Sequence, residues 1–392
     1  MDPSPRRRRV LAGLAGVGLG AGVAGCTGDE EPTPEPTPDD EREPLSGSWS
    51  TFAHDGANTG HEPAIDGPFV EIDRAWSFET GSSVTSSPVF DENTLYVGST
   101  DGSVYALDPY VGAEIWSFEI GAPIASTPSV SDGTLYVGSG DDHLYAIDVD
   151  DGTERWRFDT GGRVDSSPTV GPDSVYVGSV SNAAYAVDRD SGERRWRFQT
   201  DASVLDAPAL SGDRVYIGSG DQNVYAIDAD DGTEQWAFRT DGSVAGAPAV
   251  VDGTVYAGSR DGNVYAIEAD SGERQWAFGV DGRLQGSPTV TDTRVYAGSN
   301  DGALWAIDTE GDEPTAPWRF RTGGPVTASS AATATHVFVA STSGNVFAMR
   351  PDDGATVWRE DVGSGIREGP AVAEGWLFFG ADDGSVYALR SG

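Results

Sequence analysis

The chain has 392 residues, about twice the length of an ordinary domain, and a formal net charge of -38 from 63 acidic and 25 basic residues. Every basic residue is an arginine, and the sequence contains no lysine. A surface this acidic argues against nucleic-acid binding, because phosphate contacts need patches of lysine and arginine. The single cysteine excludes an intramolecular disulfide.

The acidic excess and the missing lysine together resemble the composition of exported proteins of extreme halophiles. A large net charge keeps a protein soluble but repels its own compact state, unless salt near 1 M shortens the Debye length to roughly 3 Å. We therefore expect the β-sheet circular dichroism to be lost when salt falls toward about 0.1 M, where the Debye length is roughly 10 Å. The acidic surface of a mesophilic protein is the alternative interpretation.

The amino-terminal segment 1–25 has the features of an export signal. Residues 6–9 are four arginines, and the apolar run that follows is too short to span a bilayer comfortably. Arg7-Arg8-Arg9-Val10-Leu11 fits the twin-arginine pattern, and Val23-Ala24-Gly25-Cys26 resembles a lipobox. The segment predicts export by the twin-arginine route, lipid attachment at Cys26 and an extracellular location at the face of the cytoplasmic membrane.

Two further segments precede the repeats. Residues 26–45 are rich in Pro, Glu, Asp and Thr and have almost nothing apolar to bury, which predicts a disordered acidic tether. Residues 46–72 are predicted to be a leader that packs on the domain formed by residues 73–392. This domain organisation predicts a membrane-anchored cell-surface protein, and we expect a monomer.

Tryptophans recur along the remaining chain at spacings of 40 residues, with one spacing of 42. A fixed period of this length predicts stacked or radial units. Each unit contains four short runs of Val, Tyr, Ile, Leu, Trp and Phe bounded by Gly, Asp, Ser and Pro, as expected for β-strands. Four strands in about 40 residues predict an all-β fold whose unit is a propeller blade. The repeated tryptophans are Trp76, Trp116, Trp156, Trp196, Trp236, Trp276, Trp318 and Trp358.

Eight innermost strands are marked by a proline or its equivalent, at Pro88, Pro128, Pro168, Pro208, Pro248, Pro288, Ser330 and Pro370. The last unit ends without a tryptophan strand, whereas the strand around Trp76 precedes the first innermost strand. We therefore predict an eight-bladed β-propeller of four-stranded blades in which the N-terminal strand completes the last blade. Such closure removes the exposed sheet edges. The turn before each tryptophan is expected to let the indole pack between blades.

The segment from Tyr225 to Trp236 contains Tyr-Ala-Ile-Asp, a short spacer, glycine, polar residues and tryptophan. It is similar to the tryptophan-docking repeat of the pyrroloquinoline quinone (PQQ) propellers. The segment from Trp49 to Gly60 resembles the leader of the BamB-like, non-enzymatic branch of this family. The resemblance covers nearly all of the predicted mature domain and implies a propeller built of PQQ-like repeats, whose repeated residues form the scaffold.

The chain departs from the quinoprotein dehydrogenases of the same family. Those enzymes have insertions that carry calcium ligands and a catalytic aspartate, and many have adjacent cysteines. Here only two extra residues, near 310–317, interrupt the period, and no position matches a catalytic base. We therefore predict no catalytic residue, no cofactor and no metal. A PQQ-dependent dehydrogenase with PQQ and calcium remains the alternative.

Two sets of polar residues could be read as metal sites. One aspartate recurs in a hairpin of most units and most often precedes glycine, so a turn role is the better interpretation. His54, Asp55 and His61 fit no standard metal-ligand spacing. The recurring aspartates are Asp101, Asp141, Asp221, Asp261, Asp301 and Asp383.

Function is expected where the otherwise similar units differ, in loops around one mouth of the central channel. The leading interpretation is a non-catalytic scaffold that binds an unknown protein partner on this face. Carbohydrate or small-anion binding is a further alternative, and pairing of the arginines with local carboxylates is the purely structural explanation. Asp206 and Glu368 stand nearby. The candidate face consists of Arg163, Asp165, Arg260, Arg283, Gln285 and Arg367.

Overall fold

The computed structural model describes residues 45, 49–65, 71–309 and 313–392. The predicted signal peptide, Cys26 and nearly all of the predicted tether lie outside these residues, as do residues 46–48 and 66–70 of the leader. Within the described ranges all regular secondary structure is β, and no helix is long and apolar enough to cross a membrane.

Eight antiparallel sheets, here called blades 1 to 8, make up the fold. Blade 1 contains β3 (Val89–Asp91), β4 (Thr94–Gly98), β5 (Ser103–Leu107) and β6 (Glu114–Glu119), and blade 2 contains β7 (Ser129–Ser131), β8 (Thr134–Gly138), β9 (His143–Asp148) and β10 (Glu154–Asp159). Blade 3 contains β11 (Thr169–Val170), β12 (Ser174–Ser179), β13 (Ala183–Asp188) and β14 (Arg194–Gln199), and blade 4 contains β15 (Ala209–Ser211), β16 (Arg214–Gly218), β17 (Asn223–Asp228) and β18 (Glu234–Arg239).

Blades 5 to 8 follow the same order from the inside outwards. Blade 5 contains β19 (Ala249–Val251), β20 (Thr254–Gly258), β21 (Asn263–Glu268) and β22 (Arg274–Gly279), and blade 6 contains β23 (Thr289–Val290), β24 (Arg294–Gly298), β25 (Ala303–Asp308) and β26 (Thr315–Arg321). Blade 7 contains β27 (Ala331–Thr333), β28 (Val337–Ala340), β29 (Asn345–Met349) and β30 (Thr356–Asp361), and blade 8 contains β31 (Ala371–Ala373), β32 (Trp376–Gly380), β33 (Ser385–Ser391) and β2 (Ile72–Glu79).

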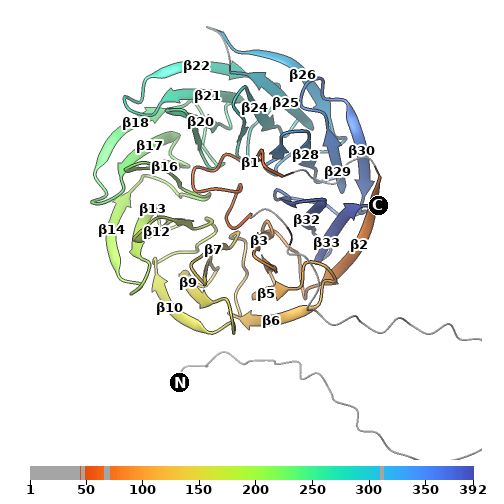
Figure 1. Ribbon diagram of the computed structural model, residues 1–392. Helices are drawn as coiled ribbons and strands as arrows, with labels where there is room; N and C mark the ends of the chain where they lie inside the picture. Colours follow the sequence, from red (N-terminus) through yellow and green to blue (C-terminus); the bar gives the residue numbers. More distant parts are fainter. Residues whose placement is uncertain (1–44, 46–48, 66–70, 310–312) are drawn as a thin grey trace, which may run out of the picture.

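The blades are arranged radially around a central channel, and the last blade is closed by both ends of the repeat domain (Figure 1). Strand β2 pairs antiparallel with β33 along its length, with Trp76 opposite Ala388 and Glu79 opposite Ser385. The predicted eight-bladed propeller and its closure by the N-terminal strand are therefore confirmed. Strand β2 thus covers the outer edge of β33, which would otherwise be unpaired at the junction.

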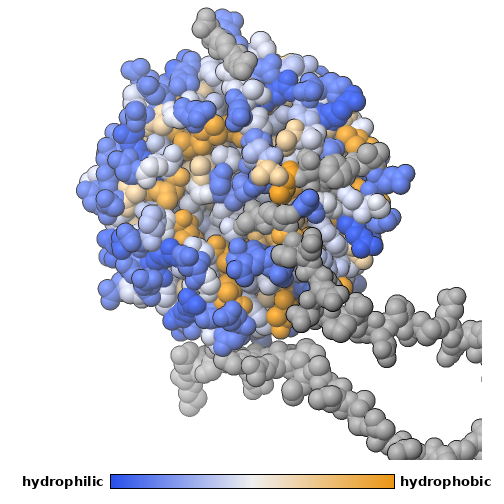
Figure 2. Space-filling view, viewed as in Figure 1, coloured by the Kyte–Doolittle hydropathy of each residue, from blue (hydrophilic) through white to orange (hydrophobic). Residues whose placement is uncertain are grey.

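The strands of a blade become more exposed from the inside outwards. All six residues of β12 are buried, whereas the outermost strand β14 alternates between exposed and buried positions. The middle strands are continuous apolar runs because neighbouring blades cover both of their faces. The outermost strands bury the tryptophan on one face and place charged residues in solvent. Figure 2 accordingly shows hydrophilic residues over most of the rim, with hydrophobic bands between blades.

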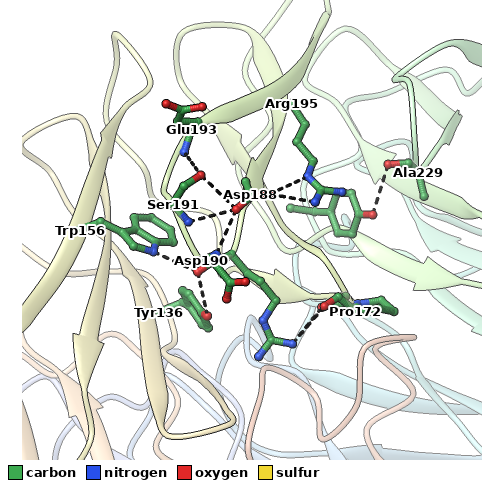
Figure 3. Close-up of polar contacts among 12 residues, drawn as sticks. Tyr136, Trp156, Pro172, Asp188, Asp190, Ser191, Glu193, Arg195 and Ala229 are labelled. Carbon is green, nitrogen blue, oxygen red and sulfur yellow. Dashed lines mark hydrogen bonds and ion pairs between the residues drawn. The ribbon is translucent and has the colours of Figure 1, made fainter.

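Neighbouring blades are joined at the rim by the repeated tryptophans, as Figure 3 shows for blades 2 and 3. The Trp156 indole N–H donates to the Arg189 carbonyl over 3.0 Å. Gly192 in the same turn has φ +71°, and a Cβ at that position would lie 2.8 Å from the Trp156 ring. The indole thus packs on a surface that only glycine provides.

Side chains of the next blade hold that turn in shape. Asp188 accepts hydrogen bonds from the amides of Asp190 and Ser191, and from the Arg195 guanidinium at 2.8 Å (Figure 3). The Arg195 hydrogen bond, followed by those from Ser191, lowers the pKa of Asp188. The turn therefore presents a fixed carbonyl and a flat glycine to the neighbouring indole.

The leader segment 49–65 runs across one end of the channel (Figure 1). Its backbone pairs with successive innermost strands: the amides of Val130, Leu210, Val250, Val290 and Ala332 donate to leader carbonyls over 2.7 to 2.9 Å. A two-residue strand, β1 (His61–Glu62), adds in parallel to β27.

Side chains of the leader close the channel at this end. Phe52 and Ala53 pack against Ala207 and Ala247 of blades 4 and 5. The buried Asn58 amide donates to the carbonyl of Pro208 at 3.0 Å and to that of Pro248 at 3.2 Å. The channel is therefore plugged at the leader end.

Candidate functional site

The end of the channel opposite the leader carries the loops in which the blades differ. Each blade is an antiparallel meander, so the loop that enters its innermost strand and the hairpin between its second and third strands lie at the same end. The leader contacts the other end of the innermost strands. We call the loop-bearing end the open face.

A pocket of about 540 Å³ is hollowed into the centre of the open face. This volume lies within the usual range for ligand sites, roughly 300 to 1,000 Å³. Loops from all eight blades contribute to its wall. The lining residues are Thr85, Pro123, Ala125, Thr127, Arg163, Asp165, Ser167, Leu205, Asp206, Ala245, Arg260, Gln285, Thr327, Arg367 and Glu368.

Five of the six residues predicted for the candidate face line this pocket: Arg163, Asp165, Arg260, Gln285 and Arg367. The sixth residue, Arg283, lies outside the lining but on the same face, where its carbonyl accepts a hydrogen bond from the Asn300 amide. The loop positions that vary between repeats therefore converge in space. Their role in binding stays a prediction.

The arginines at the pocket differ in their partners. Arg163 pairs with Asp165 at 2.7 Å, and Arg367 pairs with Asp382 at 2.8 Å. Exposed pairs of this kind are weak, about 0 to 1 kcal/mol, but they neutralise charge locally. Arg260 and Arg283 are exposed and form no ion pair with the described residues. Pairing with a local carboxylate therefore accounts for two of these four arginines, Arg163 and Arg367.

Two carboxylates lie among the lining residues at the entrance to the innermost strands. In blades 1 to 3 the equivalent residues are serines whose hydroxyls accept hydrogen bonds from glycine amides of their own blade, at Gly98, Gly138 and Gly178. Blades 4 and 8 replace that serine by Asp206 and Glu368. These blades stand opposite each other in an eight-membered ring.

The environment of these carboxylates disfavours their charge. Burial raises the pKa of Asp206 to about 6, although the amides of Ala207 and Ala247 and the Ser287 hydroxyl favour its ionised form. Burial raises the pKa of Glu368 well above its usual range, and the charge of Asp206 raises it further. Both side chains are half-buried and line the pocket. The sequence alone placed Asp206 and Glu368 only near the candidate face. The signal that could have singled them out is that each replaces the serine found at the same repeat position in blades 1 to 3.

The recurring aspartates serve the hairpins, as predicted. Asp101 accepts a hydrogen bond from the Ser103 amide at 2.9 Å and another from the Tyr105 hydroxyl at 2.7 Å. The same tyrosine hydrogen bond occurs in four other blades, at Asp141, Asp221, Asp261 and Asp383.

Blade 6 is the exception among the hairpin aspartates. Its tyrosine is replaced by Trp305, and both the Trp305 indole N–H and Asp301 Oδ2 are buried without a hydrogen-bond partner in the described structure. Asp301 Oδ1 still accepts a hydrogen bond from the Ala303 amide at 3.2 Å, and Oδ2 lies 3.5 Å from the Arg321 guanidinium.

The histidine-containing leader residues are explained by local contacts. His54 lies 3.2 Å from Glu62, and Asp55 accepts hydrogen bonds from the amide and hydroxyl of Thr59. Among the described residues no group of three or more His, Cys, Asp or Glu side chains is arranged to hold a metal ion.

The pocket does not fit PQQ with calcium, the cofactor implied by part of the resemblance. None of the lining residues is aromatic, so the lining provides no ring to stack on a flat quinone. Calcium requires about six to eight oxygen ligands, whereas Asp206 and Glu368 are the only carboxylates there outside the Arg163–Asp165 pair.

Comparison with known proteins identifies relatives of the whole repeat domain. The model of the family described as outer membrane protein assembly factor BamB matches residues 72–164, 149–247, 239–314 and 311–391. No curated protein matches.

Solved structures of two functional kinds share the fold. BamB from Moraxella catarrhalis superposes with a TM-score of 0.71 at 20% identity, covering 82% of this chain and 100% of that chain. Quinohemoprotein alcohol dehydrogenase from Comamonas testosteroni has a TM-score of 0.74 at 15% identity, covering 88% and 80%. A europium-containing methanol dehydrogenase has a TM-score of 0.75 at 14% identity, covering 88% and 98%. At these identities the likeness shows the fold alone.

Proposed function

Because the chain belongs to the family described by the model of outer membrane protein assembly factor BamB, we propose that it is a non-catalytic propeller that binds a protein partner at its open face. The sequence of segment 1–26 adds the proposal that it is exported by the twin-arginine route and held by lipid on Cys26 at the extracellular face of the membrane. The acidic composition adds that it works in concentrated salt.

One observation carries the proposal: residues that differ between blades converge on a pocket at the end of the channel that the leader leaves open. The leader plugs the other end through Phe52 and Asn58. Leu205, an exposed apolar residue on a largely polar domain, stands at the pocket. An exposed leucine beside arginines is a composition suited to protein recognition.

A catalytic role has less support from the described residues. The pocket lining includes no histidine or cysteine, and its one serine, Ser167, accepts a hydrogen bond from the Thr127 amide. The pocket lining offers no aromatic ring to stack on a planar quinone, so it gives no specific support to a quinone-dependent dehydrogenase. BamB and dehydrogenase structures are similarly close in fold, so this choice rests on the pocket.

The test is photo-crosslinking in whole cells grown in their native salt. A photo-reactive amino acid replaces Leu205, which is 38% exposed at the pocket, and in a matched control it replaces Ile115, which is 53% exposed on β6. We expect one defined protein to be captured from position 205 and not from position 115. Equal capture from both positions, or none from 205, would contradict the proposal.

A biochemical assay addresses the enzymatic alternative. Purified protein in molar salt is mixed with PQQ and calcium and assayed for dye reduction with alcohols and sugars. We expect neither stoichiometric quinone binding nor dye reduction. Substrate-dependent reduction would replace the scaffold with a dehydrogenase, and saturable binding of a sugar or a small anion would identify a small-molecule receptor.

A further inference from the structure

The pocket is lined by both acidic and arginine side chains, which the repeated scaffold does not require. Asp206 and Glu368 come from opposite blades at the position where blades 1 to 3 have serine. The remaining blades have only Gly246, Gly286 and Ala328 there. These small residues leave the two carboxylates as the long side chains at this level of the channel.

Asp206 is held both by its own blade and by blade 6. One oxygen accepts the Ala207 amide at 2.8 Å, and the other lies 3.4 Å from the hydroxyl of Ser287, two blades away. Glu368 is different, since its carboxylate makes no hydrogen bond to the described residues. Its interaction with the charge of Asp206 is repulsive when both are ionised. Glu368 in its charged form is therefore unfavourable for the fold, and its carboxylate oxygens keep unused hydrogen-bond acceptor capacity in the pocket lining.

A second side chain without a hydrogen bond lies in the same wall. Thr327 lines the pocket in blade 7, and its hydroxyl oxygen is buried without a hydrogen-bond partner in the described structure. Buried polar groups in native proteins are nearly always paired, so this hydroxyl, in the same pocket lining as a carboxylate without a hydrogen bond, favours a site completed by a ligand.

The positive side of the pocket is supplied by its arginines. Arg163 and Arg367 are engaged with Asp165 and Asp382, which leaves the exposed Arg260 as the lining cation without an ion pair in the described structure. In all, three arginines and three acidic residues line the pocket, although the chain as a whole has a net charge of -38. A balanced lining in so acidic a protein favours a ligand that itself carries both charges.

We propose that the pocket binds a zwitterionic peptide segment, whose ammonium group lies between Asp206 and Glu368 and whose carboxylate reaches Arg260. The proposal rests on the proposed protein-binding function and names the chemistry of the partner: a lysine or free amino terminus followed by an acidic residue. A pocket of about 540 Å³ is larger than one amino acid needs and accommodates a short stretch of chain.

Other ligand chemistries match fewer of these features. A simple anion would satisfy Arg260 but would approach two carboxylates. A simple amine would satisfy the carboxylates and leave the arginine unused. A calcium ion would find only two carboxylates outside the Arg163–Asp165 pair and would leave Arg260 unused. The peptide ammonium provides up to three donors, enough for both carboxylates.

The experiment is calorimetric titration of the folded, mature protein in molar KCl with end-blocked peptides that contain one lysine and one glutamate separated by increasing numbers of glycines. Control peptides have norleucine in place of lysine, or glutamine in place of glutamate. We expect saturable binding of at least one spacing and about tenfold weaker binding of both its controls. No saturable binding of any spacing up to about 10 mM would overturn the proposal.

Variants place the bound peptide in the pocket. Glu368→Gln removes the charge of a group that makes no hydrogen bond, so the fold is kept, and Arg260→Gln removes the unpaired cation. We expect each to weaken binding about tenfold, whereas Asp270→Asn, at an exposed pair with Arg214, should leave it unchanged. Unchanged binding in Glu368→Gln would overturn the site.

Proton release provides an independent readout. An ammonium group favours ionised carboxylates, so binding between about pH 5 and about pH 7 should release protons and strengthen as pH rises. The other charged lining groups, Arg163, Asp165, Arg260 and Arg367, are held by ion pairs or are arginines, and no histidine lines the pocket. Binding heats that do not depend on the buffer's ionisation enthalpy would contradict a contact with these carboxylates.

The outcome can be separated from that of the scaffold proposal. If crosslinking from Leu205 captures a partner but Glu368→Gln leaves capture unchanged, the scaffold stands and the ammonium contact is wrong. If the peptides bind in the pocket but nothing is captured from Leu205, the site is real and the protein partner is wrong.

Discussion

At the rim, six of the eight repeated indoles meet a glycine and a carbonyl of the next blade, whereas at the channel mouth neighbouring blades present different side chains. Trp116, Trp156, Trp196 and Trp236 each donate to a carbonyl at 2.8 to 3.0 Å, and the facing turns are nearly identical. Within the part of the chain that the structure describes, the mouth instead has a carboxylate without a hydrogen bond, a hydroxyl without a partner and an arginine without an ion pair. Contacts satisfied within the chain indicate scaffold, and unsatisfied groups that converge indicate a binding surface.

The strongest test of this comparison is the loss of one docking indole. Trp236 is 9% exposed and its N–H donates to the Ala269 carbonyl at 2.9 Å. Trp236→Ala should lower the free energy of unfolding by about 3 to 5 kcal/mol. Denaturant titration in molar salt measures it. Trp236→Phe, which keeps a ring but loses the N–H, should lose less, and an unchanged midpoint in Trp236→Ala would show that the joint carries little stability.

A glycine that faces a docking indole, here Gly232 in the joint of Trp196, should be nearly as sensitive. Gly232 has φ +75°, and a Cβ there would lie 2.8 Å from the Trp196 ring. Gly232→Ala combines a backbone cost of about 1 to 2 kcal/mol with a steric one of about 1 to 3 kcal/mol. Gly253→Ala is the matched control, because Gly253 has φ +74° and nothing within 4 Å of the added Cβ. Equal losses of unfolding free energy in the two variants would show that the Trp196 indole moves aside without a steric penalty.

At the mouth, removing a charge should stabilise the protein. The pKa values of Asp206 and Glu368 are raised in the fold, so their protonated forms are favoured, and stability present below the unfolded-state pKa is lost as pH rises through the folded-state values. At about pH 8, Glu368→Gln should raise the free energy of unfolding by about 1 to 3 kcal/mol. Melting curves across pH should also become flatter. A destabilised variant with an unchanged pH profile would show that Glu368 is a structural residue.

The sequence predicted the ring and the rim well because both depend on repetition. A spacing of 40 residues repeats the contact between Trp156 and Gly192 in other blades, as between Trp196 and Gly232. Five of the six candidate face residues could be placed together for the same reason: equivalent loops share one end of the ring.

The interaction between the Asp206 and Glu368 carboxylates could not be predicted from the sequence. Asp206 and Glu368 belong to blades that are far apart in the chain and opposite in the ring, so only the width of the channel determines that their charges interact. Which arginines have ion pairs was likewise undetermined, since Asp382, the partner of Arg367, lies on a different loop.

The smallest expected effect concerns blade 6, where Trp305 replaces the tyrosine of the repeat at a position outside the pocket lining. In five blades a tyrosine hydroxyl donates to the hairpin aspartate, and Trp305 breaks this contact and leaves Asp301 Oδ2 and its own N–H unpaired. Trp305 still packs edge-on against Phe278 and under Arg319. A tyrosine ring is expected to keep these packing contacts in part.

The informative quantity is therefore the difference between two substitutions at this one position. Trp305→Tyr and Trp305→Phe lose the same indole, but only the tyrosine restores the hydrogen bond, so Tyr should exceed Phe by about 1 kcal/mol in the free energy of unfolding. Tyr265→Phe in blade 5, where the hydroxyl donates to Asp261 at 2.8 Å, should lose a similar amount. If Tyr and Phe at position 305 are equally stable while Tyr265→Phe is destabilised, blade 6 has a local geometry of its own, and Asp301 would then belong with the variable residues of the open face rather than with the scaffold.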